Sequence, residues 1–190
     1  PESSSGTQDY YSFDYGDVHI LCINNQVSCD SGSPQYNFAR SDLQASTRTW
    51  KIVISHNPAY CSGGHNEDAK MVFMSRKIFV PNNVDMVISG HSHFYQHNYL
   101  DGIHHMVVGD AGAPQSAPDY APYTILSVQD YEFGIIDVTP ISFTLKIFNN
   151  LTLEFDSVKL IKPAPVSGPV NGIKTVGPPP SDFVSLTQAI

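Results

Sequence analysis

Three histidines of this 190-residue sequence follow short apolar runs. His56 ends the stretch Lys51-Ile-Val-Ile-Ser-His56, and the run Val84–Ser89 leads into Gly90-His91-Ser92-His93. Neutral imidazole is a favoured ligand of zinc and iron, and a short turn can aim two rings in one direction. A single histidine at a strand end is more often a solvated loop residue, but the repeated pattern favours a metal site. The sequence therefore predicts that His56, His91 and His93 bind a transition metal.

The two apolar runs have the composition of buried parallel strands, because they are rich in β-branched residues. Between them, Asn66 can cap a helix with an acidic first turn and with Arg76 and Lys77 in its late turns. The crossover of such a βαβ unit is nearly always right-handed, so the carboxyl ends of both strands face one crevice. We therefore expect an α/β fold in which the ring nitrogens of the three histidines converge at one edge of a sheet.

The order of the motifs resembles that of a known enzyme family. After His56-Asn-Pro58 and Gly90–His93 come Asp101-Gly102 and Val107–Gly112, and Tyr11–His19 has the pattern of a preceding strand pair. This order resembles the C-terminal half of the calcineurin-like metallophosphoesterases, and most closely their purple acid phosphatase-like branch. The resemblance covers residues 10–112, and it implies a mixed α/β and α+β domain that forms part of a two-sheet sandwich.

The resemblance also implies a role for each candidate residue. His56 and His91 would bind one metal ion and His93 a second, the two ions being divalent or trivalent iron, zinc or manganese. His65 would lie over the phosphate of a phosphate-ester substrate, where a histidine can protonate the leaving alkoxide. The alternative for His65 is an exposed loop or helix-cap residue. Tyr60 would either contact the substrate or pack in the core.

The family's upstream metal-ligand motifs do not occur in this sequence. They are Asp-x-His, Gly-Asp-x-x-Asp and Gly-Asn-His followed by an acidic residue, whereas Asp14, Asp17 and Asp30 stand in none of these patterns. A two-ion site needs a bridging carboxylate. We therefore expect a complete form to be a metal-dependent phosphoesterase, and this chain alone to hold metal weakly and to be inactive. The alternative is an extracellular structural module that self-associates through edge strands and its C-terminal tail.

Composition and charge exclude some classes of partner. The formal net charge is −8 and the chain has ten Lys and Arg, so we expect no nucleic-acid surface. No apolar run is long enough to span a bilayer. The sequon Asn150-Leu-Thr152, in a predicted turn, makes Asn150 a candidate glycosylation site, and together with the low charge it predicts a secreted protein.

The spacing of Cys22 and Cys29 is equally compatible with a disulfide bridge between them and with two free thiols. Cys61 can be a metal-adjacent thiol, a spare thiol or a bridge partner.

The remaining pattern predicts the other elements and the boundaries. Residues 1–9 read as a flexible leader, residues 10–162 as the phosphoesterase-like domain and residues 163–190 as a proline-rich extended tail. Asp101-Gly102 predicts a hairpin turn, beside which His97, His104 and His105 read mainly as surface histidines. Asp110 can accept a hydrogen bond from a residue that binds metal, and Trp50 is predicted to lie in the core.

Further predictions are strands at Tyr10–Asp14 and Val18–Ile23 and a short helix at Phe38–Ser46. The C-terminal part is predicted to form an antiparallel meander that completes the second sheet, with strands at Tyr123–Val128, Tyr131–Val138, Ile141–Phe148 and Leu151–Ile161.

Overall fold

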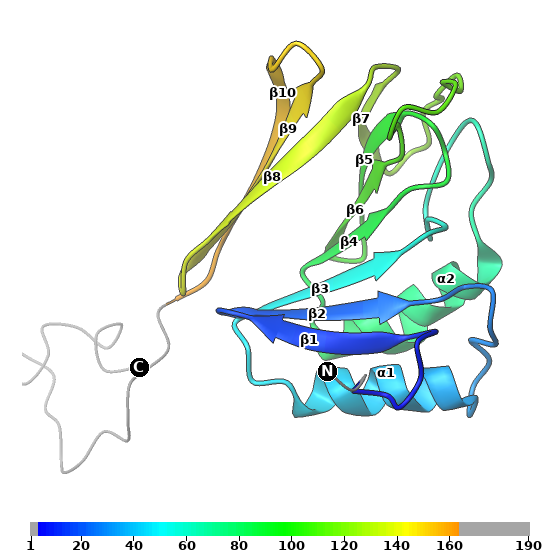
Figure 1. Cartoon of the computed structure of the whole chain (residues 1–190), viewed down its shortest axis with the longest axis vertical. Coiled ribbons are helices and arrows are strands. Elements are labelled where there is room, and N and C mark those ends of the chain that lie inside the picture. Colours follow the sequence, from blue (N-terminus) through cyan, green and yellow to red (C-terminus); the bar gives the residue numbers. More distant parts are fainter. Residues whose placement is uncertain (1–3, 164–190) are drawn as a thin grey trace, which may run out of the picture.

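The structure is a computed structural model, and it describes residues 4–163. Within that range the strands form a seven-stranded sheet in the order β1-β2-β3-β4-β6-β5-β7 and a three-stranded sheet in the order β10-β9-β8 (Figure 1). The strands of the first sheet are β1 (Tyr11–Tyr15), β2 (Val18–Ile23), β3 (Trp50–Ser55), β4 (Met86–Ser89), β5 (Tyr95–Leu100), β6 (Ile103–Val108) and β7 (Thr124–Val128). The strands of the second are β8 (Glu132–Val138), β9 (Ser142–Asn149) and β10 (Glu154–Ile161). Apart from Pro163, the predicted tail lies outside the described residues.

The predicted βαβ unit is confirmed. Strands β2, β3, β4 and β6 run parallel as neighbours, with Ile52 paired to Met86 and Ser55 to Ser89. The connection from β3 to β4 passes through α2 (Ala69–Met74), the π-helical turn η1 (Ser75–Phe79) and the 3₁₀ turn η2 (Val80–Asn82). Parallel strands present their carboxyl ends at one edge of the sheet, so His56 and His91 leave the sheet side by side.

A side-chain cap marks the start of each of the two α-helices in the described residues. Ser33 caps α1 (Pro34–Ala45), with its side chain accepting from the Tyr36 amide and with Pro34 at the first turn, so this helix starts earlier than predicted. The prediction that Asn66 caps the second helix is wrong. Asp68 does so, because its carboxylate accepts hydrogen bonds from the amides of Lys70 and Met71. Both helices cover the same face of the large sheet (Figure 1).

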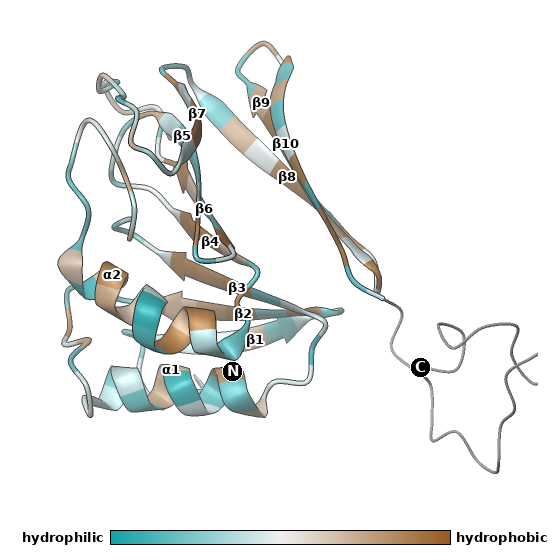
Figure 2. Ribbon diagram, turned by 180° about the vertical axis from the view of Figure 1, so that it is seen from behind, coloured by the Kyte–Doolittle hydropathy of each residue, from teal (hydrophilic) through white to brown (hydrophobic). Residues whose placement is uncertain are grey.

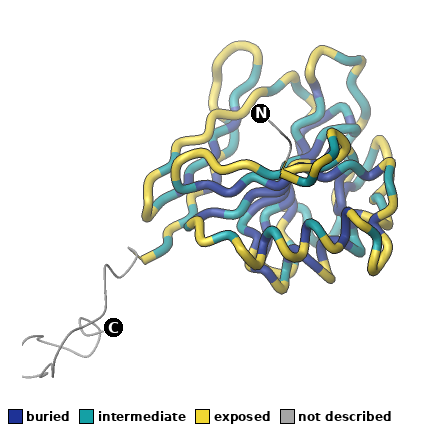
Figure 3. Tube along the Cα trace, turned by 60° about the horizontal axis from the view of Figure 1, so that its bottom comes forward, coloured by how far each residue is buried: buried dark blue, intermediate teal, exposed yellow. Residues whose placement is uncertain are grey.

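Two hydrophobic layers lie on opposite faces of the large sheet. On the helix side, Leu21 and Val53 pack with the helical residues Leu43 and Met71. On the other side, residues of the two sheets pack against each other around Trp50, which is fully buried and donates its indole N–H to the Thr139 carbonyl at 2.9 Å. The apolar stripes of the strands and of α2 mark these layers in Figure 2, and the buried central strands are visible in Figure 3. Trp50 is therefore core, as predicted.

The second sheet is smaller than the sequence predicted. Only β8, β9 and β10 form the antiparallel meander, whereas β7 pairs with β5 and extends the first sheet. The reason is that β5 has a free edge after pairing with β6, and residues around Thr124 supply the next strand. Asn98 contributes by accepting a hydrogen bond from Thr124 Oγ1 at 2.8 Å through its Oδ1.

The structure adds two details at the beginning of the chain. The described leader residues are attached to β1, because the Ser12 amide donates to Ser4 Oγ at 2.8 Å and Ser4 Oγ donates to the Ser12 carbonyl at 2.9 Å. Cys22 and Cys29 form no bridge; both are free thiols, as is Cys61. Burial raises the pKa of all three thiols, which keeps them protonated.

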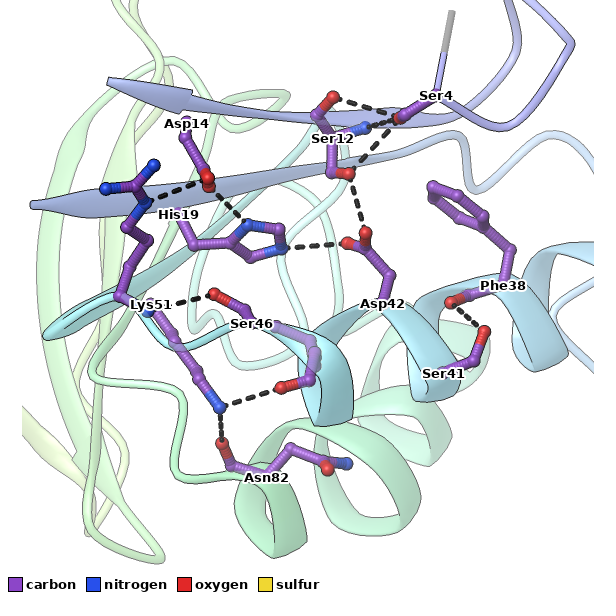
Figure 4. A network of polar contacts seen from close by, with 12 residues as sticks. Ser4, Ser12, Asp14, His19, Phe38, Ser41, Asp42, Ser46, Lys51 and Asn82 are labelled. Atoms are coloured by element: carbon purple, nitrogen blue, oxygen red, sulfur yellow. Dashed lines mark hydrogen bonds and ion pairs between the residues drawn. The ribbon is translucent and has the colours of Figure 1, made fainter. Parts of the chain in front are cut away.

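A buried histidine joins β1 to α1 at the amino-terminal end of β2. His19 lies between two carboxylates, with Nδ1 at 2.8 Å from Asp14 and Nε2 at 2.8 Å from Asp42 (Figure 4). Arg48 also donates to Asp14, at 2.8 Å. Both ring nitrogens can donate at once only when the imidazole is protonated. Burial opposes that charge, but the hydrogen bonds that His19 donates to Asp42 and Asp14 outweigh it and raise the pKa of His19.

We expect the His19 contribution to stability to depend on pH. A pKa raised in the folded state gives stabilisation that is complete below the unfolded value of about 6.5 and is lost as the pH rises through the folded value. The urea midpoint of His19→Gln should therefore lie furthest below the wild-type midpoint near pH 6, and the two midpoints should approach each other toward pH 9. His65→Gln, at an exposed position, is the control. A midpoint difference that stays constant across this range would contradict the ion-pair account.

Candidate metal centre

The carboxyl ends of β3 and β4 bring two of the predicted ligands together. Ser55 Oγ lies 3.0 Å from Ser89 Oγ at the last paired position, and the Gly90 amide donates to the His56 carbonyl at 3.0 Å. Just beyond, His91 Nδ1 lies 3.1 Å from His56 Nε2, with the two ring centroids 4.9 Å apart. This part of the predicted convergence is present in the structure.

His91 adopts a left-handed backbone conformation, with φ of 68°. For a residue with a side chain this conformation costs about 1 kcal/mol or more, so surrounding contacts must enforce it. One such contact is Gly109, which follows β6 and lies directly behind the turn. A Cβ at Gly109 would stand 1.9 Å from the Ser92 carbonyl oxygen, so only glycine allows this approach. The strained turn directs the His91 ring toward His56.

His65 joins this pair from the loop after β3. Its ring is exposed and stacks on that of His91, with centroids 4.1 Å apart and an interplanar angle of 26°. Ser92 fixes the loop, because its Oγ accepts from the His65 amide at 3.2 Å and from the Cys61 thiol at 3.3 Å. Cys61 therefore supports the backbone of the site and does not point its sulfur into it as a ligand. No sequence pattern predicts the role of Ser92, apart from its place between two histidines.

His93 has a different environment from the other three histidines. Its Nδ1 lies 2.9 Å from the Pro114 carbonyl oxygen. A carbonyl oxygen can only accept, so Nδ1 carries a proton, and in the neutral ring the lone pair is on Nε2. The Ser116 amide donates to the His93 carbonyl at 2.9 Å. The ring is half-buried, and a positive charge on it would lower the pKa of His91.

Electrostatics keep His91 neutral. Its pKa is lowered, first by burial and then by the neighbouring His65, His56 and His93. A neutral imidazole has the lone pair that a metal ion requires.

The His56–His91 pair fits one metal ion. Two imidazole nitrogens that bind a single zinc ion at 2.0–2.1 Å with an angle near 90–110° are separated by about 2.9–3.4 Å, and the observed separation of these nitrogens is 3.1 Å. Among residues 4–163, however, no three His, Cys, Asp or Glu side chains are arranged to hold an ion. His56 and His91 are thus placed to supply two ligands to one ion. His93, with its proton on Nδ1, is a further candidate ligand through Nε2.

Several other sequence predictions are corrected by burial. Tyr60 is 2% exposed and packs edge-on against His105 and Tyr123, which favours core packing, one of the two roles predicted for it. His97 and His105 are buried and are not surface histidines. His97 Nδ1 donates to Asp156 Oδ2 at 2.9 Å. Its Nε2 lies 2.8 Å from His104 Nδ1. None of these side chains is in contact with the His56–His91 pair.

The family assignment follows from this geometry and from comparison with known sequences. A profile of the family described as calcineurin-like phosphoesterase matches residues 3–95, which include β2, β3, β4 and all four site histidines. Residues 3–95 therefore resemble the calcineurin-like metallophosphoesterases. Plant purple acid phosphatases are among the proteins to which the chain is similar. The chain is 30% identical over 131 residues to the probable inactive purple acid phosphatase 9 of Arabidopsis thaliana, covering 60% of this chain and 20% of that protein.

Two further comparisons agree with this assignment. The chain is 30% identical over 131 residues to the Fe(3+)-Zn(2+) purple acid phosphatase 12 of Arabidopsis thaliana, covering 63% of this chain and 28% of that protein. It therefore spans less than a third of the length of these relatives. The solved structure of purple acid phosphatase PPD1 from yellow lupin (Lupinus luteus) has the same fold, with a TM-score of 0.72 at 21% identity, covering 80% of this chain and 32% of that one. In the described part of the chain, no helix has the length and apolarity needed to cross a membrane.

Proposed function

We propose that this chain supplies the histidine side of a metal-dependent site that hydrolyses phosphate esters. The observation that carries the proposal is the 3.1 Å separation of His56 Nε2 and His91 Nδ1 at the carboxyl ends of adjacent parallel strands. Ligands bind at this edge in open α/β sheets. The family resemblance favours phosphate esters as the substrate class. The upstream carboxylate and amide ligands that we expect a complete two-ion site to need are not among the described residues.

In this proposal His56 and His91 hold one ion and His93 contributes its Nε2 to a second. A bound ion would act as a Lewis acid and lower the pKa of a bound water. Iron, zinc and manganese all accept imidazole, and the name of the related phosphatase 12 gives iron and zinc for that protein. His65 is exposed and stacked on His91, and its role in this proposal is to protonate the leaving alkoxide.

The charge of the chain makes phosphate binding a direct test. At a net charge of −8, an anion has little reason to bind without a metal. Calorimetric titration of orthophosphate into the zinc-loaded chain should show binding, whereas the metal-free chain should show none. Hydrolysis of an aryl phosphate monoester is followed in the same samples. Equal phosphate binding with and without zinc would contradict the proposal, as would bound zinc that attracts no phosphate.

Export and glycosylation are part of this proposal. Asn150 is exposed in the turn between β9 and β10, where a glycan can project without displacing a strand. Treatment of the natively expressed protein with an amidase that removes N-linked glycans should lower its mass, and Asn150→Gln should remove that difference.

A second candidate is a structural module that self-associates, and an apolar cleft between the sheets favours it. The cleft has a volume of about 420 Å³ and is lined by residues of both sheets, among them Tyr15, Ile52, Ile136 and Phe143. The edge strands β1 and β8 flank it, and Phe13 and Ile136 are 46% and 45% exposed. An unpaired apolar edge is a template for another strand. Two copies related by a two-fold axis can place β1 of each beside β8 of the other, which covers both clefts at once.

This candidate predicts a concentration-dependent dimer. Phe13→Lys should shift the equilibrium measured by sedimentation toward monomer, because a charge on the edge strand opposes pairing. Ile125→Lys is the matched control, since Ile125 is exposed on β7 at the opposite edge of the same sheet. A wild-type chain that stays monomeric at all concentrations would remove this candidate.

A further inference from the structure

We infer that Glu132, at the start of β8, is a positioning residue that sets the ring orientation and tautomer of His93 through the loop of residues 109–116. The inference concerns a side chain of the second sheet that does not touch the histidines. It rests on the proposed role of His93 as a ligand, and the tested property is a feature of the metal-free chain.

The first step is the contact between this loop and the His91–His93 turn. The loop begins at Gly109, which lies against the Ser92 carbonyl, and continues through Pro114, whose carbonyl accepts from His93 Nδ1 at 2.9 Å. The Ser116 amide then donates to the His93 carbonyl at 2.9 Å. His93 is thus held at its ring and at its backbone by one segment. If that segment moves, the ring loses its acceptor.

The second step is the attachment of the loop to the other sheet. Glu132 Oε1 accepts from the Asp110 amide at 3.1 Å, and Asp110 Oδ2 accepts from Gln115 Nε2 at 3.0 Å. Glu132 therefore fixes the beginning of the loop, and the side chain of Asp110 fixes its far end next to Pro114. The chain of contacts runs from β8 to Asp110, then to Gln115 and Pro114, and ends at the ring of His93.

The third step concerns the two remaining carboxyl oxygens. Asp110 is 3% exposed, and its Oδ1 has no hydrogen-bond partner within residues 4–163; the same holds for the buried Glu132 Oε2. Burial, together with repulsion from Asp110, raises the pKa of Glu132 to about 7. Burial also raises the pKa of Asp110. Burial thus disfavours the charged form of both carboxyl groups.

The consequence is a defined nitrogen for a ligand. Histidines that bind metals usually donate their other ring N–H to a carbonyl or carboxylate, which fixes tautomer and orientation. In His93 that donor is Nδ1 and that carbonyl belongs to Pro114, so Nε2 is left with the lone pair. The sequence places Glu132 at 39 positions from His93, and no local pattern predicts that the two are linked.

The test is a measurement of the His93 tautomer by long-range ¹H–¹⁵N NMR on the metal-free full chain. In the wild type we expect the proton on Nδ1. Glu132→Gln keeps the acceptor oxygen and adds a donor in place of the carboxyl proton, so it should match the wild type. Glu132→Ala should reduce the Nδ1–H population of His93 by at least about twofold. Glu154→Ala, on the exposed part of the same sheet, is the control and should leave it unchanged.

The outcomes distinguish this inference from a purely structural role and from the proposed function. If Glu132→Ala lowers the melting temperature but leaves the His93 tautomer as in the wild type, Glu132 is not a positioning residue. If Glu132→Ala does not fold, Gln115→Ala tests the same loop with Glu132 in place, and an unchanged tautomer there overturns the inference. Failure of the chain to bind zinc would count against the proposed function and would leave the tautomer result standing.

Discussion

Replacing His91 with alanine is expected to weaken zinc binding by the chain by at least about 100-fold, because loss of residues that only support a ligand already costs 10–100-fold. His91 provides one of two nitrogens separated by 3.1 Å, and its pKa is lowered by burial and by three neighbouring histidines. Without it, His56 is a single exposed imidazole. Phosphate binding by the zinc-treated sample should disappear at the same time, since the metal would be the cation that holds the anion.

The control for this experiment is His104→Gln. His104 is also a histidine of the large sheet, but it is hydrogen-bonded to His97 and lies away from the site. Its replacement should leave zinc affinity within the error of the wild type. Zinc affinity in His91→Ala that equals the wild-type value would show that the ion binds elsewhere, and the assignment of the metal centre to this edge would then be wrong.

Gly109→Ala is expected to be among the most damaging single substitutions in the chain. A Cβ at this position would lie 1.9 Å from the Ser92 carbonyl oxygen and 2.9 Å from its carbonyl carbon, and both belong to backbone that cannot rotate away. Overpacking of a tight contact costs about 1–3 kcal/mol and occasionally more, and we expect the upper end here or above it. The turn that carries His91 and His93 must shift, so metal binding and stability should fall together.

Gly90→Ala is the matched control, because it lies in the same turn. Its Cβ would meet nothing closer than 3.8 Å, and Gly90 is not among the glycines with positive φ. Chemical denaturation should place its unfolding free energy close to that of the wild type. If Gly109→Ala unfolds at the same denaturant concentration as Gly90→Ala, the close approach of the loop to the turn does not exist in solution.

The sequence by itself determined the elements whose signals are local. Apolar runs rich in β-branched residues predicted β3 and β4. The helix predicted between them implied parallel pairing, which places His56 beside His91. Asp101-Gly102 predicted a hairpin turn, and both residues have the positive φ that a two-residue turn of this kind requires. These predictions were correct because each depends on a few neighbouring residues and on the geometry of one strand or turn.

Only the tertiary structure decided which side chains surround the histidines. Tyr60 and His97 have types and positions that suit a site or a surface, yet packing between elements buries them. Asp68 replaces Asn66 as the helix cap because Asn25, from the loop after β2, and Asn57, from the start of its own loop, donate to its carboxylate at 3.0 and 2.9 Å and hold it in place. Glu132 reaches the site from the second sheet. Such contacts join residues that are far apart in the chain, and no periodic pattern records them, since they depend on how the two sheets and the loops pack.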